Sequence, residues 1–166
     1  MTFADIPAAS AVFLDANTFI YHFAPDPILA SPCTDLLIRA KKQEVEGYTS
    51  THVISEVAHR LMTIEAIKTF GWPVAGIVSR LQKHPAEVMK LSAFRAAIQE
   101  IPQFGLHVLT ITPDLLDAGA AVSQQSGLLS NDALIVAVMQ RHGLSNLASH
   151  DHGFDRVPGI ARFAPA

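Results

Sequence analysis

The sequence predicts an α/β protein in which a mostly parallel sheet is covered by helices on both faces. Short apolar segments typical of buried strands alternate with longer segments typical of helices, and this alternation favours parallel strands joined by helical crossovers. Hydrophobic residues make up 49% of the 166-residue chain and charged residues only 16%, so the chain can bury a substantial core. We therefore expect one domain that spans residues 1–166.

The chain opens with a predicted strand over residues 11–15, with the sequence AVFLD, which ends in a carboxylate. Residues 17–23 begin a helix, which Pro25 and Pro27 bring to an end. A second helix is expected over residues 33–47, with apolar positions on one side and basic positions on the other.

A second strand is expected over residues 47–50, with the sequence GYTS, and a helix follows it over residues 52–67. Ser50 or Thr51 is the expected N-cap, because a hydroxyl at that position accepts a hydrogen bond from the first turn. Apolar residues recur in this segment at helical spacing and give it one buried face.

The sequence GWP, at residues 71–73, then interrupts the chain. Two helical segments are expected after it, over residues 74–84 and 85–101, with Pro85 at the first helical position of the second.

In the last third of the chain, predicted strands and helices alternate again. Residues 106–111 form a β-rich run, and Thr112 is the expected cap of a helix over residues 113–127. Ser130 is the expected cap of the next helix, over residues 131–143. Two further short strands are predicted, over residues 144–149 and 161–165.

Composition narrows the class of protein. The net charge of −3 gives no overall electrostatic case for a nucleic-acid partner, and the single cysteine, Cys33, excludes an internal disulfide and a thiolate zinc cluster. The amino terminus has no signal-peptide pattern. The longest apolar run, residues 133–139, is far too short to span a membrane and reads as a buried helix. We expect a soluble, cytoplasmic protein.

Four acidic residues follow the predicted strands or stand in the first turns of the helices after them: Asp15, Glu56, Asp132 and Asp151. The carboxyl ends of parallel strands share one edge of a sheet, so the four side chains should gather there. None has a lysine or arginine within two positions. Each alone has a structural explanation, such as helix capping by Asp15, but four unpaired carboxylates repel unless a cation neutralises them. All-oxygen ligands favour Mg²⁺ or Mn²⁺.

Zinc is the alternative that the histidines raise. His150 and His152 flank Asp151, but zinc needs further nitrogen or sulfur ligands at suitable spacing. His52 and His59 are seven residues apart on one predicted helix, hence two turns apart. The other histidines show no paired spacing, so the carboxylate interpretation is favoured.

Four segments, taken together and in order, resemble the sequence blocks of the PIN-domain family: FLDANTFIYHF, YTSTHVISEVAHRL, SNDALIVAVMQRHG and NLASHDHGFDRVPGI. They are most similar to the ribonuclease toxins of the VapC type from bacterial toxin–antitoxin pairs. The resemblance implies a PIN-like three-layer sandwich and metal-dependent cleavage of RNA. It also implies a cognate antitoxin protein and a homodimer.

The resemblance carries the catalytic and metal-binding roles onto Asp15, Glu56, Asp132 and Asp151. Water activation and neutralisation of phosphoryl charge are the tasks that such a site must perform. Further residues are expected to support it by orienting an acid, contacting phosphate or adding an auxiliary acid: Asn17, Ser130, His150 and Asp155.

The chain departs from the family pattern in three places. His150 stands where Asn is common, and Gly153 replaces an acid, which leaves Asp155 as the auxiliary acid. Residues 71–99 form a longer helical insertion than the compact toxins carry. This insertion keeps open a non-toxin role in RNA processing.

Other classes also place acids at strand ends. A phosphoaspartate enzyme would have Asp where Asn17 stands, and a receiver domain would need a second acid beside the first. A non-catalytic PIN-like module that binds nucleic acid typically has lost acids, whereas all four are present here.

Overall fold

The computed structural model describes residues 1–166 and contains a five-stranded sheet with the order β3-β2-β1-β4-β5. Every strand pairing is parallel, so the expected parallel sheet is confirmed. The strands are short, with three to five residues each. Their bounds are β1 Ala11–Leu14, β2 Glu46–Ser50, β3 His107–Leu109, β4 Asn146–Ala148 and β5 Ala161–Phe163.

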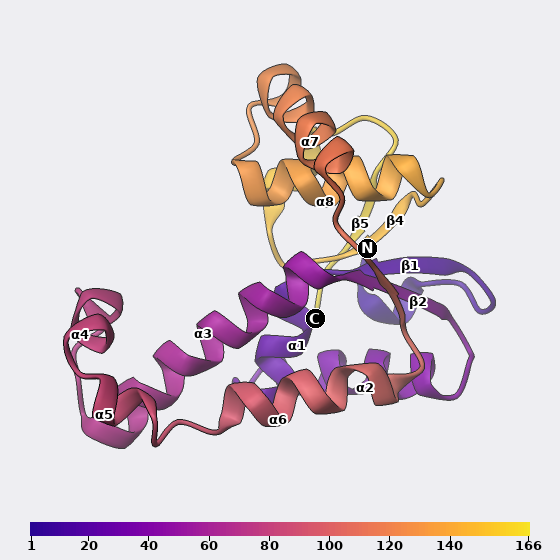
Figure 1. The fold of residues 1–166 in the computed structure, drawn as a ribbon. Helices are drawn as coiled ribbons and strands as arrows, with labels where there is room; N and C mark the ends of the chain where they lie inside the picture. Colours follow the sequence, from indigo (N-terminus) through magenta and orange to yellow (C-terminus); the bar gives the residue numbers. More distant parts are fainter.

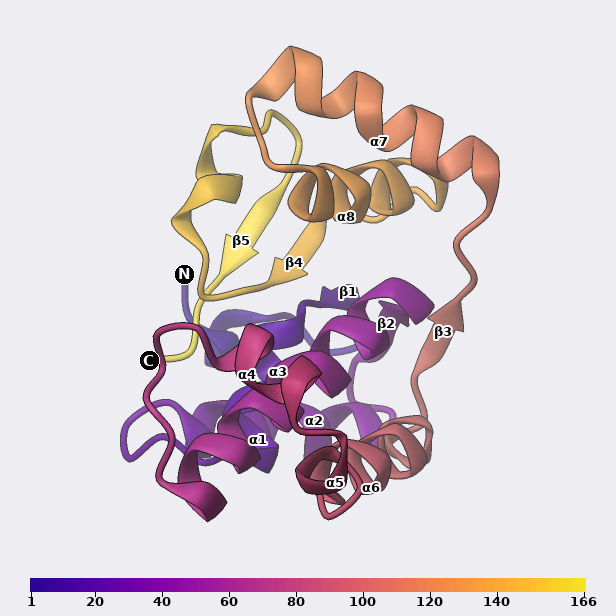
Figure 2. The ribbon, with the colours of Figure 1, turned by 60° about the vertical axis from the view of Figure 1, so that its left-hand side comes forward.

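Eight α-helices connect the strands and cover the sheet on both faces (Figure 2). The pair α7 and α8 lies on one face, and α1, α2, α3 and α6 lie on the other, which confirms the three layers. The helix bounds are α1 Ala16–Phe23, α2 Ala30–Lys41, α3 Thr51–Phe70, α4 Ile77–Lys83, α5 Pro85–Val88, α6 Ala93–Glu100, α7 Pro113–Ser126 and α8 Ser130–Arg141. Short 3₁₀ turns lie at η1 Phe3–Asp5, η2 Ile101–Phe104 and η3 His152–Arg156.

A hydrophobic core of 33 buried residues joins the sheet to the helices that pack against it. The apolar run of residues 133–139 lies in α8 and is buried throughout, as expected for a helix covered on several sides.

The two chain ends lie together, because Thr2 forms a parallel bridge with Ala164. Arg39 belongs to the basic side predicted for the second helix, and its guanidinium donates to the carbonyl oxygens of Phe3 (2.8 Å) and Ile6 (2.6 Å). It therefore fixes the amino-terminal segment.

Of the two serines predicted as helix caps, the structure confirms Ser50 but not Ser130. Ser50 caps α3 by accepting the Val53 N–H, as expected. Ser130 does not cap α8: it is the first helical residue, and Leu129 holds the N-cap position without a side-chain bond. A strand-to-helix junction fixed by the sheet was therefore easier to predict than one that follows another helix.

The predicted helix over residues 85–101 is in fact two helices, α5 and α6. The break has a cause elsewhere in the chain: the carboxylate of Glu65, on α3, accepts the N–H groups of Ser92 (3.0 Å) and Ala93 (2.9 Å). These groups lie where α6 begins and would otherwise lack a partner. Likewise, α4 starts only at Ile77, because Gly76 takes a left-handed conformation with φ 73°.

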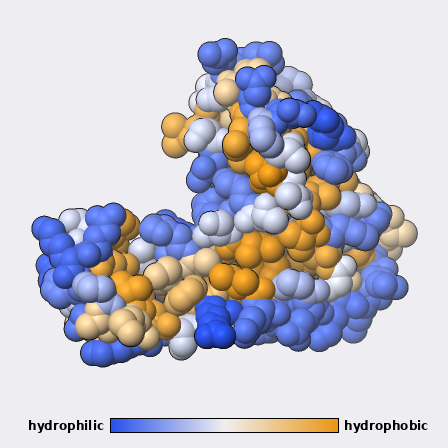
Figure 3. Space-filling view, viewed as in Figure 1, coloured by the Kyte–Doolittle hydropathy of each residue, from blue (hydrophilic) through white to orange (hydrophobic).

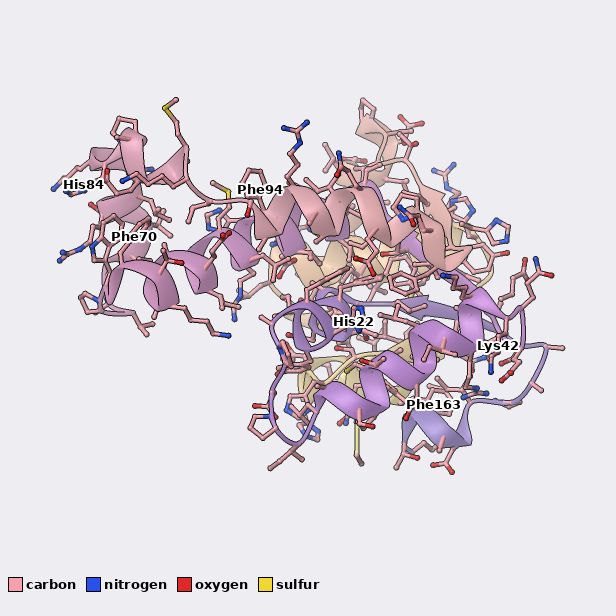
Figure 4. The ribbon with its side chains drawn as sticks, turned by 90° about the horizontal axis from the view of Figure 1, so that it is seen from below. His22, Lys42, Phe70, His84, Phe94 and Phe163 are labelled. Carbon is pink, nitrogen blue, oxygen red and sulfur yellow. The ribbon has the colours of Figure 1, made fainter.

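The carboxyl-terminal end of α3 projects from the body together with α4, α5 and the start of α6, and we call residues 66–95 the arm (Figures 1 and 4). A separate small core of Ala66, Ile77, Leu81 and Leu91 holds it together. Residues 71–99, which we predict to be an insertion, account for most of it. No helix combines the length and the apolar character that crossing a membrane requires.

Candidate active site at the carboxyl edge of the sheet

Asp15 is the most firmly held of the four predicted acids. It follows β1, caps α1 and is only 5% exposed. Its carboxylate accepts hydrogen bonds from the Ala16 N–H (2.6 Å), the Ser149 hydroxyl (2.7 Å) and the Asn17 amide (3.2 Å). Asn17 thus makes the contact expected of it, and Asp15 is the N-cap of α1. Three donors fix this carboxylate at the edge of the sheet.

Ser149 joins two of the acids, and sequence reasoning missed it. Its hydroxyl donates to Asp15 and accepts the backbone N–H of Asp151 at 3.0 Å. The residue is fully buried directly after β4, beside β1. A polar residue directly after the apolar pair Leu147 and Ala148, two positions before an acid, was the signal that could have found it.

Asp151 lies at the exposed rim of the same edge. It caps the short turn η3, and its carboxylate accepts the Gly153 N–H. The β4 strand that carries it pairs directly with β1, which carries Asp15. The predicted convergence of these two acids therefore follows from neighbouring strands.

Asp132 and Glu56 complete the group from two helices. Asp132 is half-buried in the first turn of α8, and burial raises the pKa of its carboxyl, with the charges of Asp151 and Asp15 adding to the rise. Burial likewise raises the pKa of Asp15 to about 6, against the lowering effect of its hydrogen bonds, and Glu56 raises it further. The charges of the four carboxylates therefore interact with one another. We call Asp15, Glu56, Asp132 and Asp151 the acid edge.

No lysine or arginine forms an ion pair with any member of the acid edge. At the same time, no three acidic, histidine or cysteine side chains stand close enough in the structure to hold one metal ion together. The donor chemistry fits a hard dication, because every member offers carboxylate oxygens and their mutual repulsion lacks a cation. Rotation of the more exposed side chains is needed to bring them to one ion.

His52 is a further residue at this edge whose role we did not predict. It stands in the first turn of α3, one turn before Glu56, and both of its ring nitrogens are buried without a hydrogen-bond partner. Its charge lowers the pKa of Asp132, which places it near that acid. Buried ring nitrogens without a hydrogen-bond partner are rare in folded proteins, which makes His52 an unusual residue at this edge. The four-residue spacing from Glu56 was the available signal.

The remaining predicted residues lie around the edge without touching the acids. Ser130 is exposed at the start of α8. His150 is exposed and packs edge-on against Tyr21, with ring centroids 5.9 Å apart.

Asp155 is committed to a different partner. Its carboxylate binds Arg162 through two hydrogen bonds, of 2.7 and 3.1 Å, and His152 through one of 3.1 Å. The hydrogen bonds from Arg162 and His152 lower the pKa of Asp155 to about 2. Arg162 also donates to the Ser149 carbonyl. The pair thereby braces η3, which carries Asp151, and sequence reasoning missed Arg162 because its partner lies in another element.

Comparison with known proteins gives a consistent result. Residues 12–160 match the profile of the PIN domain family. Ribonuclease VapC13 of Mycobacterium tuberculosis is 29% identical over 119 residues, which cover 70% of this chain and 71% of that protein. Ribonuclease VapC48 of the same species is 31% identical over 101 residues, covering 54% of this chain and 66% of that protein.

Solved structures share the fold at lower sequence identity. The VapC20 toxin of M. tuberculosis, described as cleaving the sarcin–ricin loop, has a TM-score of 0.58 at 17% identity and covers 89% of this chain and 95% of its own. VapBC2 of Rickettsia felis, bound to a promoter DNA fragment, has a TM-score of 0.56 at 16% identity and covers 93% of this chain and 98% of the matched chain.

Proposed function

Because this chain belongs to the PIN domain family, we propose that it is a metal-dependent ribonuclease that acts as the toxin of a VapC-type toxin–antitoxin pair. One observation carries the proposal: four carboxylates from β1, α3, α8 and the β4 end share one edge and have no basic partner. Such an edge suits phosphodiester hydrolysis, in which a dication must offset the charge of both the acids and the phosphate.

We assign binding of Mg²⁺ or Mn²⁺ to Asp15, Asp132 and Asp151, with Glu56 bound to the ion or orienting water beside it. A dication held there supplies positive charge for the phosphoryl oxygens and a water of lowered pKa. Asp15 gives a fixed ligand, because its three hydrogen bonds leave it little freedom. Ser149 and Asn17 keep its orientation, as the supporting partners of metal ligands do.

The less constrained acids adjust to the ion. Asp132 is half-buried and Asp151 is exposed, and apart from the Gly153 N–H on Asp151 no hydrogen bond holds either carboxylate. Both can therefore turn toward a cation held by Asp15. The phosphate of the RNA would then lie on the open side of the edge, near the start of α8.

The same family likeness supports three further parts of the proposal. We propose a protein antitoxin as partner, a homodimer as assembly and the cytoplasm as location. One solved structure that shares the fold is described as a toxin–antitoxin complex from Klebsiella pneumoniae, which is why an antitoxin is the first partner to seek.

Cleavage of a labelled RNA tests the proposal directly. Purified protein should cleave with Mg²⁺ or Mn²⁺ and stop with EDTA. Asp132→Asn should lower the rate more than about 100-fold, because even residues that only orient a metal ligand cost about 10- to 100-fold. Asp117→Asn, which makes the same charge change on the exposed side of α7, is the control and should retain full activity. Undiminished cleavage in EDTA, or by Asp132→Asn, would contradict the assignment.

A further inference from the structure

The arm carries a charge opposite to that of the rest of the chain. Residues 66–95 contain five of the 12 lysines and arginines but only one of the 15 acids, which gives the arm +4 in a chain of −3. The single acid, Glu87, pairs with Lys90 at 3.9 Å. The other four basic residues form no ion pair and are exposed: Lys68, Arg80, Lys83 and Arg95. The arm is thus a concentrated source of unneutralised positive charge.

Aromatic rings stand beside these charges at the tip of the arm. The Arg80 guanidinium lies 5.7 Å from the centre of the Trp72 ring, and the His84 ring lies 5.3 Å from it on centroids. His84 is fixed by a 2.8 Å contact between its Nδ1 and the Arg80 carbonyl oxygen. The neighbouring recess of about 380 Å³ is lined by Ser79, Arg80, Lys83 and His84 together with small residues. Cations joined to aromatic rings are the chemistry that binds phosphates and bases of single strands.

The arm lies on the same side of α3 as the acid edge. Glu56 and His59 are three residues apart on α3 and are therefore neighbours on one face. His59 in turn lines a pocket whose other wall is formed by Val78 and Gln82 of α4. Helix α4 therefore packs on the face of α3 that carries Glu56 and His59.

The views agree with this placement. The amino-terminal ends of α3 and α8 lie on the side from which the arm projects (Figure 1). Figure 3 shows a recess between the arm and the part formed by α7 and α8, with hydrophilic residues covering the outer end of the arm. In Figure 4, His84 lies at that outer end, away from the body.

We propose that the tip of the arm, around Arg80, Lys83 and His84, binds the phosphate backbone of an RNA whose cleaved bond lies at the acid edge. This inference rests on the proposed ribonuclease function. The acid edge repels phosphate until a metal is bound, so the attraction that first holds the RNA must come from elsewhere, and the arm supplies it. A second copy of the chain or another protein is the competing occupant, since Val74, Val78 and Met89 are exposed near the tip.

The distance between the acid edge and the tip of the arm sets the length of RNA that can reach both. From Glu56 to the end of α3 at Phe70 there are 14 residues, or about 21 Å at the helical rise of about 1.5 Å per residue. A strand that rises about 3.4 Å per nucleotide covers this in about six nucleotides. A trinucleotide is therefore too short to engage the tip, whereas a 20-nucleotide RNA engages it.

The test compares two double variants that remove the same charge. Arg80→Gln with Lys83→Gln removes two charges from the tip, and Lys41→Gln with Lys42→Gln removes two from the exposed end of α2, which Figure 4 places at the opposite end of the molecule. Binding of a fluorescent 20-nucleotide RNA is measured in EDTA by anisotropy over a range of salt concentrations. We expect the tip variant to bind at least tenfold more weakly at low salt. The slope of log affinity against log salt should be shallower by about 1.4, at about 0.7 per lost phosphate contact. The control should match the wild type.

Cleavage assays then separate this inference from the proposed function. With Mn²⁺ present, the tip variant should cleave the trinucleotide as the wild type does and the long RNA more slowly. If the wild type binds long RNA through the tip but cleaves nothing, the ribonuclease proposal fails and the binding site stands. If cleavage occurs but the tip variant keeps the wild-type salt slope, the inference is overturned. A change in self-association by sedimentation, with RNA affinity unchanged, would overturn it in favour of a protein interface.

Discussion

The acid edge and the arm lie on the same side of the molecule but are built in different ways. The acid edge is set by the sheet: Asp15 and Asp151 follow paired strands, and a buried serine ties them together. The arm is set by one contact across the chain, from Glu65 to the start of α6, and by a small core of its own. A region organised by strand order can be read from sequence, whereas a region organised by a distant side chain cannot.

The largest expected effect is a pH-dependent loss of folding stability in the metal-free protein, caused by repulsion and burial at the acid edge. The pKa of Asp15 in the folded protein, about 6, lies above the ordinary aspartate value of 3.8. Its contribution to stability is therefore complete below about pH 4 and lost as the pH rises through about 6. The loss is at most about 3 kcal/mol by pH 7, at about 1.4 kcal/mol per pKa unit.

Asp15→Asn removes this titration. Denaturant unfolding without metal should show the wild type losing stability between pH 4 and pH 7, and the variant losing less. At pH 7 the variant should unfold no more easily than the wild type, and saturating Mn²⁺ should reverse the order, because the wild type gains about 1.4 kcal/mol per tenfold excess over Kd. Parallel pH profiles for the two proteins would show that the carboxylate is not strained.

The next effect concerns the arm. Glu65→Ala removes the acceptor for the N–H groups of Ser92 and Ala93 and should destabilise the protein by about 2 kcal/mol, since hydrogen bonds to a charged group contribute about 1.5–3 kcal/mol. Glu87→Ala, which loses only a surface ion pair, should cost less than about 1 kcal/mol.

Hydrogen exchange locates this loss. In Glu65→Ala, faster exchange should appear in α5 and α6 while the amides of β1 and β4 stay protected. Uniform loss of protection over the sheet would mean that the arm and the body unfold as one cooperative unit.

The smallest effect concerns the link between two acids. Ser149→Ala leaves Asp15 without one donor and should weaken Mn²⁺ binding by about tenfold, the lower range for residues that orient metal ligands. Thr49→Val is the matched control: its buried hydroxyl donates to the Leu14 carbonyl and touches no carboxylate. Titration calorimetry should show weaker binding for Ser149→Ala alone. Equal affinity in both variants would assign Ser149 a purely structural role.

The sequence was sufficient to predict the sheet, its parallel pairing and the strand-end acids, because these depend on apolar patterning and on positions after strands. It predicted the Asn17 contact with Asp15 because the two residues are near neighbours. It could not reveal that Arg162 holds Asp155 or that Glu65 divides a helix, since both partners come from other elements. The position of His52 was visible, but its isolation from any partner appears only when the surrounding side chains are placed.

The position of β1 in the middle of the sheet has a consequence for synthesis. Its Asp15 meets Ser149 only across 134 residues of chain, and β4 and β5 are the last strands to be made. At about 5–20 residues per second, the ribosome needs roughly 7–27 s to pass from one to the other. A growing chain therefore carries Asp15 for most of its synthesis without the residues that complete the edge.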